Sequence, residues 1–137
     1  MNKKIIKRIA EAKKTNKLDL SGMKLTAVPD EVFELKNIEK LDLADNYLRI
    51  LPTTIKDLTK LQYLDISNNC LGTIPKAISN LVNLETFFLY RNKIQTLQMN
   101  FKNLNKLQYL IIRPNYLSDD EINKIIKQLK QRKNYEC

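Results

Sequence analysis

Apolar and polar positions recur along this chain with a period of 23 residues. One apolar column comprises Leu18, Leu41, Leu64, Phe87 and Leu110. A second apolar column, two residues later, comprises Leu20, Leu43, Ile66, Leu89 and Ile112. A mostly polar residue separates the two columns, and this alternation is typical of a strand with one buried face. The pattern therefore predicts about five short strands, one in each repeat.

Each predicted strand is followed by a turn and a compact return. An asparagine column marks the turn in four repeats, at Asn46, Asn69, Asn92 and Asn115. Such a short amide can donate to and accept from the backbone of stacked turns. The apolar spacing of the return predicts a short helical or 3₁₀ segment, which Pro29, Pro52 and Pro75 can begin. One unit cannot bury its own leucines, so the repeats must stack.

Both ends of the chain predict helices that cover the stack. Ile5, Ile6 and Ile9 share one helical face near the N-terminus, and Ser118 to Glu121 forms a capping box that begins a second helix. Met23 replaces asparagine in the first repeat, as expected of a terminal repeat. We expect one complete domain over residues 1–137. Its parts are an N-terminal capping helix (1–16), the repeats (17–117) and a C-terminal capping helix (118–137).

A family resemblance is carried by two units, LDLADNYLRILPTTIKDLTKLQY (41–63) and LDISNNCLGTIPKAISNLVNLET (64–86). They resemble the typical 23-residue leucine-rich repeat, L-x-x-L-x-L-x-x-N-x-L-x-x-L-P, and the resemblance extends over about residues 15–117. It implies an α/β solenoid, a short curved stack of parallel strands that binds proteins on its concave face and has no catalytic residues. The fourth repeat departs from the pattern, because Leu97-Gln98 replaces the Leu-Pro pair.

The composition argues against an enzyme. The chain has no histidine and only two glycines, which removes the commonest general base and metal ligand and leaves no Gly-rich phosphate loop. We predict no catalytic residue, no cofactor and no metal site.

We also expect a monomer, located in the cytoplasm. Cys70 and Cys137 are far apart and suggest no disulfide framework, which favours a reducing compartment. The sequence has no 18-residue apolar run and no signal-peptide core. Export as an effector stays open.

The side chains between the buried columns form the predicted concave face, and they change along the stack. Repeats one to three carry an aspartate ladder, whereas repeats four and five place Phe88 and Ile111 in the same column. Exposed apolar residues ringed by tyrosine and arginine are typical of a binding hot spot. We predict that a protein partner of unknown identity binds Tyr63, Phe88, Tyr90, Arg91, Tyr109, Ile111 and Arg113, with Asp19, Asp42 and Asp65 setting its orientation by charge.

Three alternatives stand beside this prediction. The aspartates could serve solubility alone, and a C-terminal segment that includes Tyr135 could cover Phe88 and Ile111. The third alternative is nucleic acid or an anionic membrane surface as the partner, because residues 1–17 carry seven basic residues and one acidic residue, a net +6. That segment has no aromatic residue for base stacking. We therefore rank protein binding first.

Overall fold

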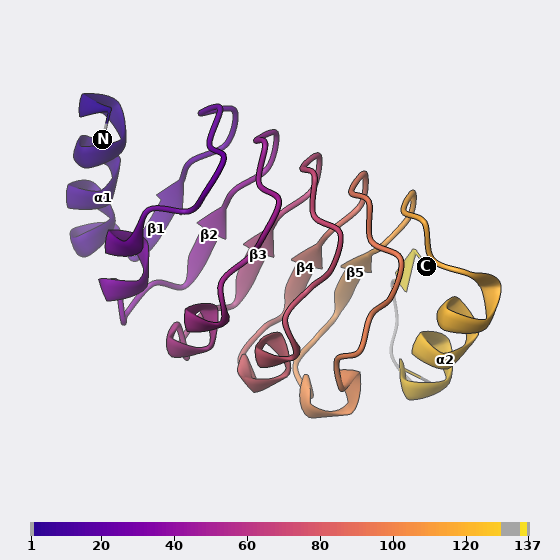
Figure 1. The fold of residues 1–137 in the computed structure, drawn as a ribbon. Coiled ribbons are helices and arrows are strands. Elements are labelled where there is room, and N and C mark those ends of the chain that lie inside the picture. The colour runs from indigo at the N-terminus through magenta and orange to yellow at the C-terminus, as the bar shows by residue number, and fades with distance from the viewer. Residues whose placement is uncertain (1, 130–134, 137) are drawn as a thin grey trace.

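The computed structural model describes residues 2–129 and 135–136. It is a curved stack of repeats between two α-helices (Figure 1). Each repeat begins with a three-residue strand, and the first four strands are followed by a return with a 3₁₀ helix. The helices are α1 (Lys3–Thr15) and α2 (Asp119–Leu129). The 3₁₀ helices are η1 (Asp30–Glu34), η2 (Thr53–Asp57), η3 (Lys76–Asn80) and η4 (Phe101–Asn103). The strands are β1 (Lys17–Asp19), β2 (Lys40–Asp42), β3 (Tyr63–Asp65), β4 (Thr86–Phe88), β5 (Tyr109–Ile111) and β6 (Tyr135–Glu136).

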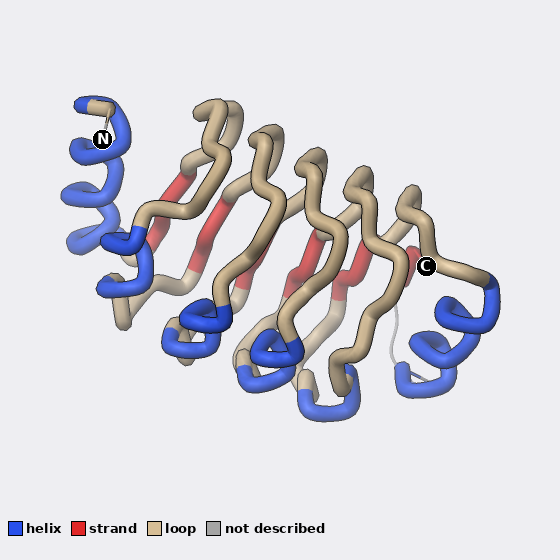
Figure 2. The backbone as a smooth tube through the Cα atoms, in the orientation of Figure 1, coloured by secondary structure: helices blue, strands red, loops and turns tan. Residues whose placement is uncertain are grey.

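The strands form one parallel sheet in chain order, and the 3₁₀ helices lie along the opposite side of the stack (Figure 2). Equivalent residues pair across neighbouring repeats, so that Leu41 lies in register with Leu18 and with Leu64. The predicted fold class, a short curved α/β solenoid, is confirmed. To the five predicted strands the structure adds β6, which pairs with β5.

The predicted C-terminal cap over 118–137 is only partly helical. The capping box is present, since the Ser118 hydroxyl accepts a hydrogen bond from the Glu121 N–H at 3.2 Å. Among the described residues α2 ends at Leu129, and Tyr135–Glu136 then run beside β5. A strand at this position pairs with backbone groups of β5 that a sheet edge would otherwise expose. Cys137 lies outside the described residues.

The core is one continuous column of side chains through the stack. The first apolar column is almost inaccessible, from 1% exposed at Leu18 to 0% at Leu110. Ile5 and Ile9 of α1 extend this core at one end, and Ile122 and Ile125 of α2 extend it at the other. The two helices therefore bury apolar faces of the terminal repeats, as their sequence patterns predict.

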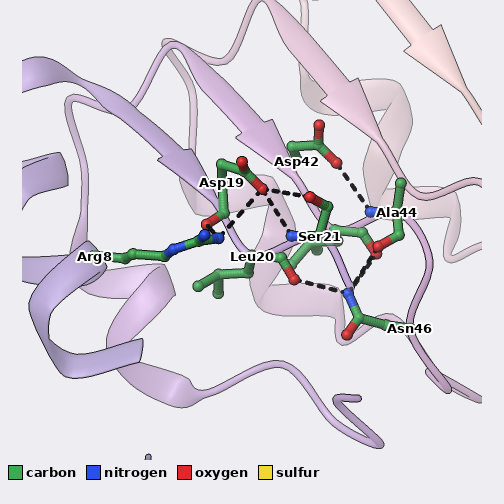
Figure 3. Close-up of polar contacts among 8 residues, drawn as sticks. Arg8, Asp19, Leu20, Ser21, Asp42, Ala44 and Asn46 are labelled. Carbon is green, nitrogen blue, oxygen red and sulfur yellow. Dashed lines mark hydrogen bonds and ion pairs between the residues drawn. The ribbon is translucent and has the colours of Figure 1, made fainter. Parts of the chain in front are cut away.

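The asparagine column holds the turns together, as predicted. The Asn46 amide nitrogen donates to the Leu20 carbonyl oxygen at 2.9 Å (Figure 3). It also donates to the Leu43 carbonyl oxygen at 3.0 Å, and the amide oxygen accepts from the Leu25 N–H at 2.9 Å. Asn69 and Asn92 repeat this arrangement one and two repeats later. Each amide thus connects its own turn to the preceding one.

The prolines act one position earlier than expected. Pro29, Pro52 and Pro75 precede the first residue of their 3₁₀ helices, where their carbonyl groups accept the first hydrogen bond, as from Val32 to Pro29 at 3.0 Å. The fourth repeat lacks this proline. There the Asn100 side chain accepts from the Lys102 N–H at 3.0 Å, and η4 has three residues instead of five.

Candidate partner-binding surface

The structure brings the predicted apolar pair together on the concave face. Phe88 ends β4 and Ile111 ends β5, the two residues are in register, and both are half-buried. Tyr90 follows β4 and is also half-buried, whereas Tyr109 at the start of β5 is 46% exposed. These four side chains contribute partly accessible apolar and aromatic surface on two adjacent repeats.

A cation–π contact and an aromatic pair connect the Phe88 side chain to the second repeat. The Lys40 ammonium lies 4.3 Å from the centre of the Tyr63 ring, and that ring meets Phe88 edge-on at 5.8 Å between centroids. Both geometries are attractive and hold the rings in fixed orientations. Sequence reasoning missed this stack, although the 23-residue register already placed Lys40, Tyr63 and the strand of Phe88 in neighbouring repeats.

The Tyr63 hydroxyl is a persistent donor within this stack. It donates to the Asp65 carboxylate at 3.4 Å. Burial, followed by the negative charges of Asp65 and Asp42, raises the pKa of Tyr63 to about 12. The phenol therefore stays protonated at neutral pH.

The aspartate ladder has a local structural role at the end of each strand. Asp19 accepts from the Ser21 N–H and hydroxyl at 2.8 and 2.7 Å, and Asp65 accepts from the same groups of Ser67 at 2.9 and 2.6 Å. Asp42 has Ala44 in place of the serine two residues later, and within the described part of the chain its carboxylate accepts the Ala44 N–H alone, at 3.0 Å (Figure 3). Asp65 is 8% exposed. The D-x-S spacing, in Asp19–Ser21 and in Asp65–Ser67, is the signal of this role in the sequence.

The surroundings shift the pKa values of Asp19 and Asp42 in opposite directions. Desolvation is the largest influence on the pKa of Asp42 and raises it; the charges of Asp65 and Asp19 add to the rise. Desolvation also acts to raise the pKa of Asp19, but hydrogen bonds from Ser21 and the charges of Arg8 and Lys40 together lower it. Of these two carboxylates, Asp42 is the one that its neighbours neutralise less.

We expect Asp42→Asn and Asp19→Asn to change stability with opposite signs. A raised folded-state pKa means that ionised Asp42 destabilises the fold above that pKa, so Asp42→Asn should raise the free energy of unfolding at neutral pH while keeping an acceptor for Ala44. A lowered pKa means that ionised Asp19 stabilises the fold above its unfolded-state pKa near 3.8. Asp19→Asn should therefore lower the free energy of unfolding at neutral pH. Urea unfolding measures the free energy of unfolding of both variants. The difference between each variant and the parent protein should shrink as the pH falls through the folded and unfolded pKa values of that carboxyl. Equal signs at neutral pH would contradict the assignment.

The two arginines border the apolar area beyond the carboxyl ends of β4 and β5. Arg91 occupies a turn with φ of 53°, in the column of left-handed residues that also contains Gly22, Asp45 and Asn68. Its side chain is exposed. Arg113 approaches Asp119 at 3.5 Å, with 55% and 94% of their side chains exposed. An exposed pair of this kind is weak.

The basic N-terminal helix uses one of its cations internally. The Arg8 guanidinium donates to the Asp19 carbonyl oxygen at 2.6 Å and lies 3.5 Å from the Asp19 carboxylate (Figure 3). The Thr15 hydroxyl donates to the Lys17 carbonyl at 3.2 Å. These contacts satisfy carbonyl groups of β1, the first strand of the sheet, and an unpaired strand edge invites association.

We expect Arg8→Ala to destabilise the fold by about 1 kcal/mol, because a charged hydrogen bond and a partly exposed ion pair are lost. Chemical unfolding measures the change. Lys7→Ala is the matched control, since Lys7 is exposed and only approaches Glu11 at 4.0 Å. Equal effects of the two substitutions would count against a specific role for Arg8.

Further features of the described part of the chain bear on function. Within residues 2–129 and 135–136 no three or more His, Cys, Asp or Glu side chains cluster in a way that could hold a metal ion. Cys70 is a free, half-buried thiol. None of the helices in this part of the chain has the length and apolar character needed to cross a membrane.

The family of the chain follows from the repeats and is shown by comparison with known proteins. The sequence matches the family described as leucine-rich repeat region over residues 6–131. This chain belongs to the leucine-rich repeat family, whose members are typically binding modules. A comparison with curated proteins gives no match.

Solved structures with similar folds come from bacteria and plants. A leucine-rich repeat protein of Leptospira interrogans is 33% identical with a TM-score of 0.79, over 83% of this chain and 29% of the other. Internalin C2 of Listeria monocytogenes is 27% identical with a TM-score of 0.74, over 94% and 53%. The plant peptide hormone receptor RGFR1, in complex with RGF2, is 31% identical with a TM-score of 0.61, over 66% and 15%. The chain thus spans between 15% and 53% of the length of these proteins.

Proposed function

We propose that this chain is a non-catalytic module that binds a partner protein on the concave face of repeats four and five. The observation that carries the proposal is the pairing of Phe88 with Ile111 on adjacent parallel strands, each half-buried, beside the exposed Tyr109. Apolar and aromatic side chains on a rigid sheet lose little conformational entropy on binding. We name the proposed surface the β4–β5 patch, which consists of Phe88, Tyr90, Arg91, Tyr109, Ile111 and Arg113.

The other predicted residues have a supporting place in this proposal. Tyr63 borders the patch through its contact with Phe88. Asp19 and Asp65 are engaged by neighbouring serines, so we assign orientation by charge chiefly to Asp42. The C-terminal strand β6 also lies beside the β4–β5 patch, since it is in register with Leu110 and Ile111 of β5. Phe88 and Ile111 nevertheless keep accessible surface.

Three observations favour a protein partner over nucleic acid or an anionic surface. Arg8, one of the basic residues of α1, is engaged with Asp19. The helix also carries no aromatic side chain on which a base could stack. RGFR1, which is similar in fold and sequence over part of its length, is in complex with RGF2.

We further infer that the protein is a monomer. We also infer a reducing, cytoplasmic compartment, in keeping with the free thiol of Cys70.

Partner capture with a double variant tests the proposal. Phe88→Asp with Ile111→Asp should leave the fold intact, because both side chains are partly exposed, and should abolish capture of partner proteins from lysate. Circular dichroism checks the fold. Tyr47→Asp with Ile50→Asp is the control, since these residues are 56% and 74% exposed away from the patch. Capture that survives the patch variant would overturn the assignment, and binding that collapses steeply with salt would favour the basic helix.

A further inference from the structure

The two halves of the concave face differ in which charges remain open to a partner. In repeats one to three the carboxylates of Asp19 and Asp65 each accept two hydrogen bonds from a serine, and Asp19 also faces Arg8. Lys40 lies over the Tyr63 ring. A charged partner segment therefore finds Asp19, Asp65 and Lys40 of this half already engaged.

In repeats four and five the open charges are positive. Arg91 is exposed, and the described residues give its guanidinium no hydrogen bond or ion pair. Arg113 has only the solvent-exposed contact with Asp119 at 3.5 Å, which a better-placed carboxylate can replace at little cost. Lys93, two residues after Arg91, is exposed as well. Guanidinium groups bind carboxylates through two parallel hydrogen bonds.

These cations adjoin the uncharged concave residues of β4 and β5, and beyond β5 the backbone of β6 places Glu136 in register with Ile111. The strand residues of β4 and β5 that point to the concave face are Thr86, Phe88, Tyr109 and Ile111, and none carries a charge. Their positions are set by the parallel register, and Tyr63 packs against Phe88. Apolar contact is therefore available along the strands and cationic contact at their carboxyl ends.

We propose that the β4–β5 patch recognises an acidic, apolar segment of its partner, in which hydrophobic side chains contact Phe88 and Ile111 while carboxylates bind Arg91 and Arg113. This inference rests on the proposed function and adds the chemistry of the partner to it. The apolar contacts supply most of the affinity, and the arginines select a partner segment whose charge is negative. A basic segment places its cations against two guanidinium groups and is rejected.

Three synthetic peptides of equal length test the proposal by fluorescence anisotropy. One alternates glutamate with phenylalanine and leucine, the second has lysine in place of glutamate, and the third has serine in place of the apolar residues. We expect the acidic, apolar peptide to bind at least about 10-fold more tightly than either other peptide. Arg91→Glu with Arg113→Glu should reverse the preference between the first two peptides.

Lys17→Glu with Lys24→Glu is the matched control. It makes the same change in net charge at exposed positions of the first repeat and should leave the preference unchanged. The inference is overturned if the acidic, apolar peptide does not bind preferentially, if the arginine variant keeps the original preference, or if the lysine variant reverses it equally. If partner capture still depends on Phe88 and Ile111 in any of these cases, the proposed function stands and only the charge selection fails.

Discussion

Leu64→Asp is expected to unfold the protein. Leu64 lies at the centre of the middle strand with 0% exposure, between Leu41 and Phe87 of the neighbouring repeats. Truncating a buried leucine alone costs about 2–5 kcal/mol, and a buried, unpaired carboxylate adds several kcal/mol more. Small domains are stable by only about 5–15 kcal/mol in total. Loss of the far-ultraviolet circular dichroism signal and of a cooperative unfolding transition measures the effect.

Two controls separate burial from charge in this experiment. Leu64→Ala should remain folded with a reduced free energy of unfolding, because it leaves a cavity without a charge. Ile50→Asp introduces the same charge at a residue that is 74% exposed, and its effect should stay within about 0.5 kcal/mol. A folded Leu64→Asp variant would mean that the leucine column of the core tolerates a buried charge, which contradicts this prediction.

Asn69→Ala is expected to lower the free energy of unfolding by about 3 kcal/mol, because a buried amide with both donor and acceptor roles is removed. The Asn69 oxygen accepts from the Leu48 N–H at 3.0 Å, and its nitrogen donates to Leu43 and Ile66 at 2.9 and 3.1 Å. The Leu43 carbonyl keeps a second donor in Asn46. The Leu48 N–H instead loses the acceptor that Asn69 supplies, inside the stack.

Asn115→Ala provides the comparison for this column. Asn115 occupies the same position in the last repeat. Its amide donates to the Leu89 carbonyl and accepts from the Ile94 N–H, but the residue is only half-buried. Water can reach the groups that it leaves, so we expect a clearly smaller loss of stability. Urea unfolding of the two variants measures the difference. Equal losses of stability would show that the burial of an asparagine in this column does not determine how much it stabilises the fold.

The candidate surface was only partly predictable from sequence. The register of the repeats placed Phe88 beside Ile111, since equal positions in a parallel solenoid are neighbours. The sequence did not reveal that Asp65 is buried or that Arg8 engages Asp19, because both depend on side chains from other elements. It also did not predict β6, since pairing with β5 joins segments about one repeat apart that share no pattern. The function assigned to the patch stays a proposal.

The sequence by itself determined the solenoid. Its 23-residue period sets the strand, the asparagine turn and the buried leucine columns of every repeat, because each unit contains the same local pattern and only stacking can bury it. The D-x-S spacing already implies the local bonds that engage Asp19 and Asp65. Only the tertiary structure decided the contacts between elements: Arg8 of α1 reaches Asp19, and Tyr63 of β3 packs against Phe88 of β4. These contacts depend on side chains that differ from repeat to repeat, so no period in the sequence encodes them.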